Sequence, residues 1–111
     1  MKQRSDYYSE VLDLYELQCL LKVSQATAKK MLYSGEIKGK KLGGQWRILK
    51  SNVVGTKPVP TDKVFGIDEL CFFLKMSRST VSKLLNSGEL RGIKTGRSWR
   101  IPKQMVIDCL I

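Results

Sequence analysis

The sequence predicts an α+β, mainly helical protein that is built from two tandem copies of one small unit. The first observation is an internal repeat: residues 12–50 align with residues 65–103 at a constant offset of 53, and 18 of these 39 positions are identical. The second is that apolar residues in each copy begin at helical spacing and end at alternating, strand-like spacing. A chain of 111 residues is long enough for two such units.

The first helix of each copy is marked by a cap and an apolar stripe. Asp13 followed by Glu16 is the pattern of a capping box, and Gly66 takes the cap position in the second copy. Capping explains the first-turn carboxylates without any chemistry. We expect a short helix that runs to about Lys22 and buries the same face in both copies. The stripe consists of Leu14, Leu17, Leu20 and Leu21 in the first copy and Ile67, Leu70, Phe73 and Leu74 in the second.

A second helix follows after a break about as long as a helix-turn-helix turn. Ser24 and Ser77 are suitable N-caps, and Gly35 and Gly88 suit the C-terminal ends. The remaining outer face is polar and basic without a carboxylate, so it could lie in a DNA major groove, although a merely solvated face is the simpler alternative. The inward residues are Ala28, Met31 and Leu32 in one copy and Val81, Leu84 and Leu85 in the other.

Each copy then ends in a predicted hairpin wing, IKGKKLGGQWRIL or LRGIKTGRSWRIP. Trp46 and Trp99 alternate with apolar residues that would fold one strand face onto the helices, so we interpret them as core anchors rather than stacking platforms. Basic and small polar residues are left near the tip or on the outer face, where they could reach a phosphate or a minor groove. These are Lys40, Lys41, Gln45 and Arg47, and Lys94, Arg97, Ser98 and Arg100.

The stretch SNVVGTKPVPTDK between the copies, with two of the three prolines, predicts a short, semi-extended linker. We assign residues 10–56 to the first unit, 57–63 to the linker, and 64–111 to the second unit with a short C-terminal helix. The apolar residues of that helix either cap the second core or form a self-association surface. They are Met105, Val106, Ile107, Leu110 and Ile111.

The basic charge belongs to the repeat. The chain carries +10 at pH 7, and each copy contributes +5 because it holds eight Lys or Arg against three Asp or Glu. Such a charge indicates a polyanionic partner, either nucleic acid or an acidic membrane surface. No apolar run is long enough for a membrane helix and the N-terminus lacks the pattern of a secretory signal. We therefore expect a cytoplasmic, nucleoid-associated protein without a membrane partner.

Catalysis and metal binding are disfavoured. The chain has no histidine, and its three cysteines are odd in number and widely spaced, which fits neither a disulfide framework nor a zinc motif. Cys19 and Cys71 are predicted to be reduced, small packing residues. We therefore predict no enzyme activity, no catalytic residues, no metal site and no cofactor.

The order of a leucine-bearing helix, S-x-x-T, a helix ending S-G-E-[IL] and then K-x-G-x-x-W-R-I resembles the excisionase and MerR-like winged helix-turn-helix DNA-binding domains. The resemblance covers residues 12–49 and 65–102 and implies two tandem winged helix-turn-helix domains, each with two or three short helices plus a β-hairpin wing. The DNA-contacting residues that it implies in the recognition helices are Ser24, Gln25, Thr27, Lys29, Lys30, Tyr33, Ser77, Arg78, Ser79, Thr80, Ser82 and Lys83. Those in the wings are Lys40, Lys41, Gly43, Gly44, Gln45, Arg47, Lys94, Gly96, Arg97, Ser98 and Arg100.

In function, the resemblance implies a sequence-specific, double-stranded DNA-binding protein. Small basic members of the family often act as recombination directionality factors that bend DNA beside an integrase, and others regulate transcription. The expectation is an excisionase-like or architectural factor of a mobile element that acts as a monomer or with weak self-association on DNA, with an integrase or recombinase as partner. A transcriptional regulator of a plasmid, phage or conjugative element is the alternative, and a protein-interaction module is a further one.

The copies differ where DNA would be read. Gln25 stands where the second copy has Arg78, and Gly44 and Gln45 stand where it has Arg97 and Ser98. The halves are therefore predicted to read different sequences in one bipartite site. A short tether between the units would raise the effective concentration of the second once the first is bound.

Overall fold

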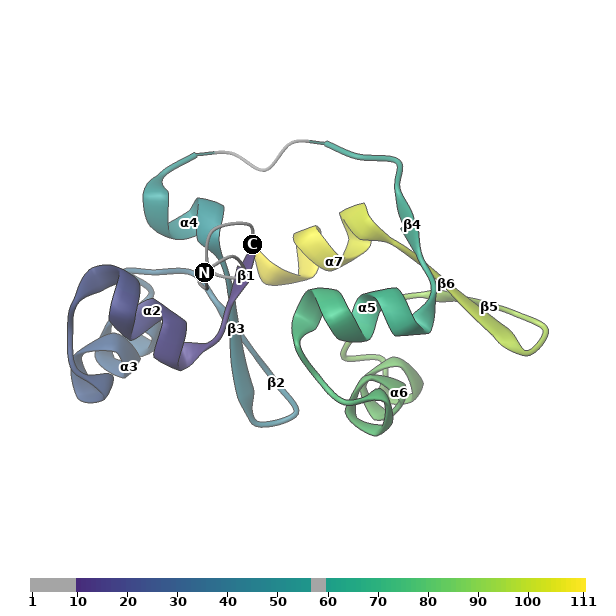
Figure 1. Cartoon of the computed structure of the whole chain (residues 1–111), viewed down its shortest axis with the longest axis horizontal. Coiled ribbons are helices and arrows are strands. Elements are labelled where there is room, and N and C mark those ends of the chain that lie inside the picture. The colour runs from purple at the N-terminus through teal and green to yellow at the C-terminus, as the bar shows by residue number, and fades with distance from the viewer. Residues whose placement is uncertain (1–9, 57–59) are drawn as a thin grey trace, which may run out of the picture. The chain divides into compact units, whose positions relative to one another are not determined.

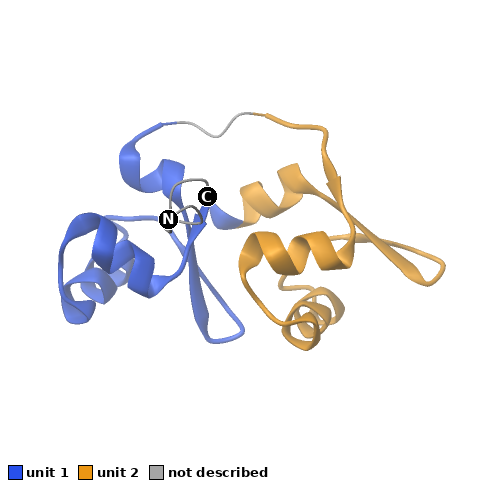
Figure 2. Cartoon of the chain, in the orientation of Figure 1, with its two compact units in different colours: residues 1–57, 110–111 blue, residues 58–109 orange. Residues whose placement is uncertain are grey.

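The computed structural model describes residues 10–56 and 60–111. The chain divides into two compact units, residues 1–57 with 110–111 and residues 58–109 (Figure 2). The described elements follow the same order in both units (Figure 1). The first holds β1 (Val11–Leu12), α2 (Leu14–Leu21), α3 (Gln25–Ser34), β2 (Lys40–Leu42), β3 (Gln45–Leu49) and α4 (Lys50–Val54). The second holds β4 (Val64–Phe65), α5 (Ile67–Leu74), α6 (Arg78–Ser87), β5 (Ile93–Thr95), β6 (Ser98–Pro102) and α7 (Lys103–Leu110). The predicted α+β class with two tandem winged helix-turn-helix units is confirmed.

The predicted caps of the first helices are present. Asp13 Oδ1 accepts a hydrogen bond from Glu16 N at 2.8 Å, and Glu16 Oε1 accepts one from Asp13 N at 2.9 Å. In the second unit Gly66 N donates to Glu69 Oε1 at 2.9 Å, but Gly66 has no side chain with which to return the bond. Both helices therefore begin where the sequence indicates.

Two residues of α2 that were expected to be buried are exposed. Leu17 is fully buried, whereas Leu20 is 41% exposed and Cys19 is exposed. Cys19 lies roughly 200° around the helix from Leu17, on the opposite side, and Leu20 lies at the edge of the buried face. In the second unit the residue equivalent to Leu20 is Phe73, which is half-buried.

The turn between the two helices depends on a lysine with a left-handed backbone. Lys22 has φ 58° and Lys75 has φ 59°. The turn closes through Val23 N, which donates to Gln18 O at 3.1 Å, and through Met76 N, which donates to Cys71 O at 3.0 Å. Lysine seldom adopts this conformation, so the sequence carried no local signal for it.

The second helices begin and end at the predicted residues. Ser24 Oγ accepts from Thr27 N at 3.2 Å, and Ser77 Oγ accepts from Thr80 N at 3.2 Å. Gly35 ends α3 with a positive φ, as its equivalent in the second copy ends α6. The residues that were expected to face inward are buried in both helices, apart from Met31, which is half-buried.

Each unit contains a three-stranded antiparallel sheet with the order β1-β3-β2 or β4-β6-β5. The hairpins β2–β3 and β5–β6 are the predicted wings, and β5–β6 projects from the rest of its unit (Figure 1). The third strands, β1 and β4, were not predicted because two residues are too few to show an alternating pattern.

The same positions form the core of each copy. In the first unit the buried cluster consists of Leu12, Leu17, Ala28, Leu32, Ile37 and Ile48. The residues 53 positions later are also buried: Phe65, Leu70, Val81, Leu85, Leu90 and Ile101. Trp46 packs against the first cluster, which is consistent with its predicted role as a core anchor.

A glycine lies where the chain passes from the second helix to the wing. A Cβ added to Gly39 would lie 2.8 Å from Ile48 Cγ1 and 3.0 Å from Leu32 Cδ2. At Gly92 the nearest atom would be Ile101 Cγ1, at 3.0 Å. The connection therefore crosses directly over the core in both units, and a side chain at this position would require repacking.

The predicted linker is partly folded. Ser51 to Val54 belong to α4, which ends at Gly55, and Asn52 Nδ2 donates to Lys38 O at 3.2 Å. The semi-extended conformation expected for this stretch was therefore wrong at residues 51–54, because a five-residue helix is too short to show helical spacing. The assignment of these residues to the first unit is unaffected. Residues 57–59 of the linker lie outside the described residues.

The last residues of the predicted linker contact the second unit. Thr61 N donates to Gln104 Oε1 at 3.2 Å, and Lys103 N donates to Lys63 O at 2.8 Å. The predicted C-terminal helix is α7. Its residues Val106, Ile107 and Leu110 are buried, whereas Ile111 is 59% exposed.

Candidate nucleic-acid interface

The outward faces of α3 and α6 carry most of the predicted recognition residues. Ser24 and Ser77 are exposed, and their hydroxyls cap the helices. Thr80 and Ser82 are half-buried. The exposed remainder is Gln25, Thr27, Lys29, Lys30 and Tyr33 in α3 and Arg78, Ser79 and Lys83 in α6. Neither helix contains Asp or Glu, so each presents a polar, positively charged face.

The wings turn differently in the two units. In the first, Leu42 pairs with Gln45 around Gly43 and Gly44, whose φ angles are 57° and 82°. Two positive φ values are those of a type I′ hairpin turn. In the second unit only Gly96 of the turn has a positive φ, 63°, and Arg97 does not, which matches the φ signs of a type II′ turn. The second wing can therefore carry an arginine at its tip without strain.

An aromatic contact joins helix and wing in the first unit. The rings of Tyr33 on α3 and Trp46 on β3 meet edge to face, with centroids 5.4 Å apart. Lys41 lies opposite Trp46 in the hairpin, and its Nζ donates to Tyr33 Oη at 3.5 Å. The predicted DNA-contacting residues Tyr33 and Lys41 thus lie together. The Trp46 indole Nε1 is buried and has no hydrogen-bond partner among the described residues.

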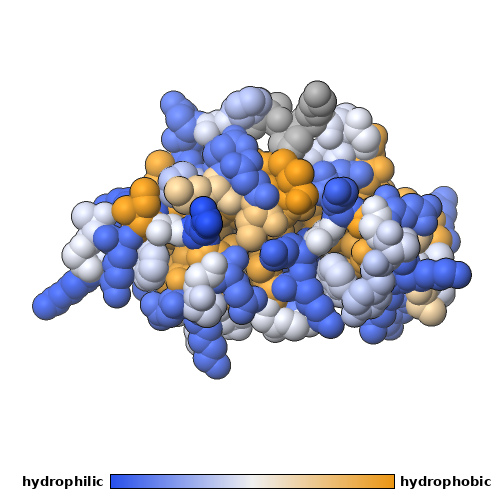
Figure 3. Space-filling view, turned by 180° about the vertical axis from the view of Figure 1, so that it is seen from behind, coloured by the Kyte–Doolittle hydropathy of each residue, from blue (hydrophilic) through white to orange (hydrophobic). Residues whose placement is uncertain are grey.

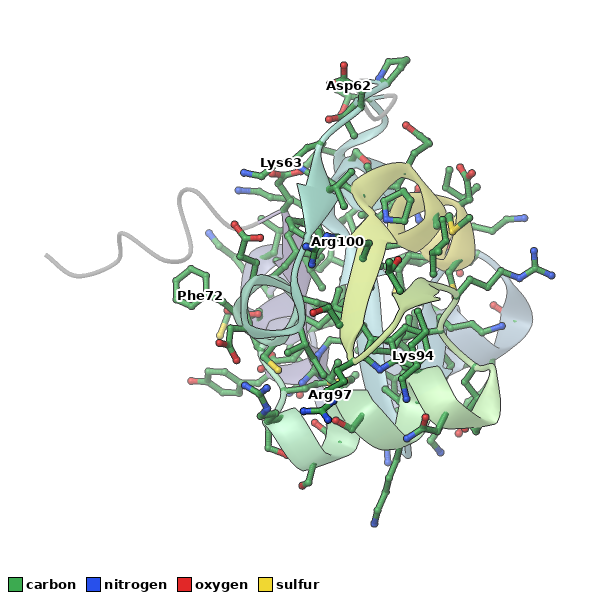
Figure 4. The ribbon with its side chains drawn as sticks, turned by 90° about the vertical axis from the view of Figure 1, so that its right-hand side faces the viewer. Asp62, Lys63, Phe72, Lys94, Arg97 and Arg100 are labelled. Carbon is green, nitrogen blue, oxygen red and sulfur yellow. The ribbon has the colours of Figure 1, made fainter. Side chains whose placement is uncertain are left out.

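The second unit has no tyrosine at the position equivalent to Tyr33, so it cannot form the same contact between helix and wing. Asn86 replaces the tyrosine, and Lys94 Nζ instead lies 5.7 Å from the ring centroid of Trp99, its cross-strand neighbour. Figure 4 shows Lys94 and Arg97 at the end of the unit where α6 lies, with Arg100 farther along the sheet. Helix and wing therefore present basic groups at one end of this unit.

One predicted wing residue is not where the sequence placed it. Arg47 was expected on the exposed outer face, but it is only 5% exposed. Its Nη1 donates to Trp46 O at 2.7 Å and its Nη2 donates to Gln45 Oε1 at 2.9 Å. Burial lowers the pKa of Arg47, and the carboxylates of Asp13 and Glu16 partly oppose that change. Its equivalent, Arg100, is exposed.

Arg47 lies on a face of β3 that is mostly apolar in the first unit. Residues 45, 47 and 49 share one face of β3, opposite Leu42 and Val11 on the adjacent strands. Val11, Leu42 and Leu49 are all buried, whereas their equivalents Val64, Thr95 and Pro102 are more exposed. The apolar residues beside Arg47 were the sequence signal that could have predicted a buried face.

Sequence reasoning also missed an ion pair at the start of α6. Arg78 Nη1 donates to Asp68 Oδ1, which comes from the first turn of α5. Both side chains remain largely exposed, at 65% for Arg78 and 81% for Asp68. Asp68 was interpreted only as a carboxylate that suits a helix N-terminus, so its proximity to a recognition residue emerges only from the fold.

The other reactive side chains in the described part of the chain are cysteines. Cys19, Cys71 and Cys109 are free thiols, and burial together with the negative charge of Asp68 raises the pKa of Cys71. Within residues 10–56 and 60–111 no three potential metal-ligating side chains come together. Across the same ranges, every helix is too short or too polar to span a bilayer.

The surface is rich in long hydrophilic side chains, many of which project from the face shown in Figure 3.

A family model described as "Helix-turn-helix domain" matches the chain twice, over residues 11–54 and 64–109. Each match runs from the first strand of a unit into its last helix. Neither the curated proteins nor the solved structures contain a significant match to the chain.

Proposed function

Because the chain belongs to the helix-turn-helix domain family, we propose that this DNA-binding protein reads a bipartite double-stranded site, one element with each unit. One observation supports the proposal most strongly. Both copies keep the same caps of the second helix, the same left-handed lysine in the turn between the helices and the same strand register in the wing. The exposed residue at the start of the second helix is nevertheless Gln25 in one copy and Arg78 in the other. A conserved scaffold with different exposed residues is what two unlike readers require.

The chemistry of these two side chains suggests what each unit reads. In the major groove a glutamine amide can bond both N6 and N7 of adenine, whereas an arginine guanidinium can bond both O6 and N7 of guanine. The N-terminal residues of a recognition helix are those that reach base edges. We therefore expect an adenine in the element read by the first unit and a guanine in that read by the second.

The surrounding lysines and arginines supply the affinity. Lys29, Lys30 and Lys83 on the helices, with Lys41 and Lys94 on the wings, are exposed and suited to phosphate oxygens. Contacts of this kind release counterions, so binding should weaken steeply as salt is raised. Arg47 is excluded from this set because it is buried.

For the biological role we propose an excisionase-like directionality or architectural factor of a mobile element, working with an integrase. The proposal is supported by the resemblance of the S-G-E and G-x-x-W-R-I segments to those of the excisionase-like domains. A transcriptional regulator is the second candidate, since it would need the same helix and wing.

Single-residue variants test the reading of bases. The probe is a duplex selected from a random pool by the intact protein, compared with a scrambled duplex of equal composition. Arg78→Ala should cost about 1–3 kcal/mol on the selected duplex and relax the preference at one base pair. Lys94→Ala is the matched control, which should weaken both duplexes alike. Equal losses on both duplexes for Arg78→Ala would contradict the assignment of Arg78 as a base reader.

A recombination assay separates the two roles. A plasmid with the element's recombined attachment sites is incubated with its integrase, with and without this protein. Excision that requires the protein supports the directionality role. Unchanged excision, together with altered expression from a promoter that contains the selected site, would support the transcriptional role instead.

A further inference from the structure

The second unit holds its leading recognition residue in an ion pair that the first unit lacks. Arg78 is the first residue of α6, and its guanidinium pairs with Asp68, the second residue of α5. The equivalent positions in the first unit are Tyr15 and Gln25, which cannot form an ion pair. The feature therefore separates the two copies at the very residues that differ in base preference.

Folding does not account for this pair. Both side chains are mostly in water, at 65% and 81% exposed, and such exposed pairs contribute little to stability. Asp68 is not needed for the cap either, because Glu69 already accepts the hydrogen bond from Gly66 N. The remaining structural role of Asp68 is a favourable charge in the first turn of α5, which Glu69 also provides.

The guanidinium can serve Asp68 and a base at once. It has five N–H donors in one plane, and a guanine edge needs two of them. A carboxylate bonded to one Nη restricts the rotation of the whole group, so the remaining donors are already oriented when they meet the groove. At a base pair without two suitable acceptors, the pre-oriented donors find no partners and the binding free energy is not gained.

The carboxylate also acts where no guanine is present. A negative charge beside Arg78 lowers the attraction of this part of the surface for phosphates, which is the main source of non-specific binding. Asp68 would thus favour the correct base and oppose contacts with DNA in general.

We propose that Asp68 is a specificity-determining positioning residue, which orients Arg78 toward guanine and reduces non-specific DNA binding by the second unit. This rests on the proposed function, since it assumes that Arg78 reads a base. It assigns the stricter discrimination to the second unit, whereas the first, without this carboxylate, tolerates more sequences.

The test measures two affinities for each variant of the intact protein. Asp68→Asn should bind the selected duplex several-fold more weakly and the scrambled duplex about two- to threefold more tightly, so that the specificity ratio falls by about tenfold. Asp62→Asn changes the net charge equally, but Asp62 lies at the opposite end of the unit from α6 (Figure 4). It should leave the ratio unchanged. The thermal midpoint of both variants should stay near that of the wild type.

A double variant separates positioning from charge alone. If Asp68 acts through Arg78, then Asp68→Asn should no longer weaken binding to the selected duplex once Arg78→Ala is present, and it should instead tighten both duplexes alike, by about two- to threefold. Replacing the contacted guanine with 7-deazaguanine, which lacks N7, should do the same.

Tighter binding of Asp68→Asn to both duplexes, or an unchanged ratio, would overturn the positioning role while leaving the proposed function intact. If the wild type itself showed no preference for the selected duplex, both the positioning role and the proposed function would fail.

Discussion

The two copies place the same arginine in opposite environments. Arg47 and Arg100 occupy equivalent positions in the wing, yet Arg47 is buried and bonded to the backbone of Trp46 and to Gln45, whereas Arg100 is exposed. The same sheet face also differs in composition, since it carries Leu42 and Leu49 in one unit and Thr95 and Pro102 in the other. The repeat therefore predicts which elements form, while the exposure of equivalent side chains can differ between the two copies.

The largest expected difference in stability between equivalent substitutions lies at Phe73 and Leu20, near the ends of α5 and α2. Phe73 is half-buried, its ring centroid lies 5.0 Å from that of Phe65, and Lys103 Nζ lies 5.4 Å from the same centroid. Leu20, in contrast, is 41% exposed. Phe73→Ala should therefore lower the free energy of unfolding by about 2–4 kcal/mol, and Leu20→Ala by less than about 1 kcal/mol. Urea denaturation measures both, and similar losses would mean that the two stripes are buried alike.

The arginine pair should give the next largest effect. Arg47→Ala removes a buried, hydrogen-bonded side chain and should cost about 1–3 kcal/mol of stability. Arg100→Ala should change stability by less than about 0.5 kcal/mol and act instead on DNA affinity. Urea denaturation and DNA-binding titrations of the two variants test this. Weaker DNA binding by Arg47→Ala without a loss of stability would contradict the comparison.

The wing turn offers a contrast within one hairpin. Gly96 has φ 63°, so Gly96→Val should strain the turn by about 1–2 kcal/mol and weaken DNA binding through the displaced wing. Arg97→Val is the matched control. Because residue 97 has no positive φ, this variant should be as stable as the wild type. Thermal melts of the two variants check this, and an unaltered midpoint for Gly96→Val would count against the turn.

The smallest effect should have the opposite sign. Lys22 and Lys75 hold left-handed backbones, with φ 58° and 59°, in which glycine is unstrained. Lys22→Gly and Lys75→Gly should each raise stability by up to about 1 kcal/mol. Lys29→Gly, in the middle of α3, should instead lower it by about 1 kcal/mol. A loss of stability at all three positions would show that the turn gains nothing from glycine.

Local chemistry made much of this fold predictable. Asp13 with Glu16, Ser24 and Gly35 are cap signals whose geometry involves only neighbouring residues, and both wings follow from short alternating segments around glycine. The strand β1 and the helix α4 were missed because each is too short to show a period. The burial of Arg47 and the pairing of Asp68 with Arg78 depend on contacts between elements, which spacing along the chain does not reveal.

The same limit applies to the candidate site. The exposed residues of α3 and α6 could be predicted because a helix with one buried face must present the other to solvent. The contact of Tyr33 with Trp46 could not, because it depends on how closely the wing approaches the helix. Contacts of this kind make the two copies different, and the proposed division between a stricter and a more tolerant reader depends on them.

The most direct test of two unlike readers is to select bound duplexes from a random pool with the intact protein and to align the winning sequences. We predict two unlike elements, one of which contains a guanine, and we expect the preference for that guanine to disappear when the selection is repeated with Arg78→Ala. A single short element, or the same element twice, would contradict the claim that the two units read different sequences.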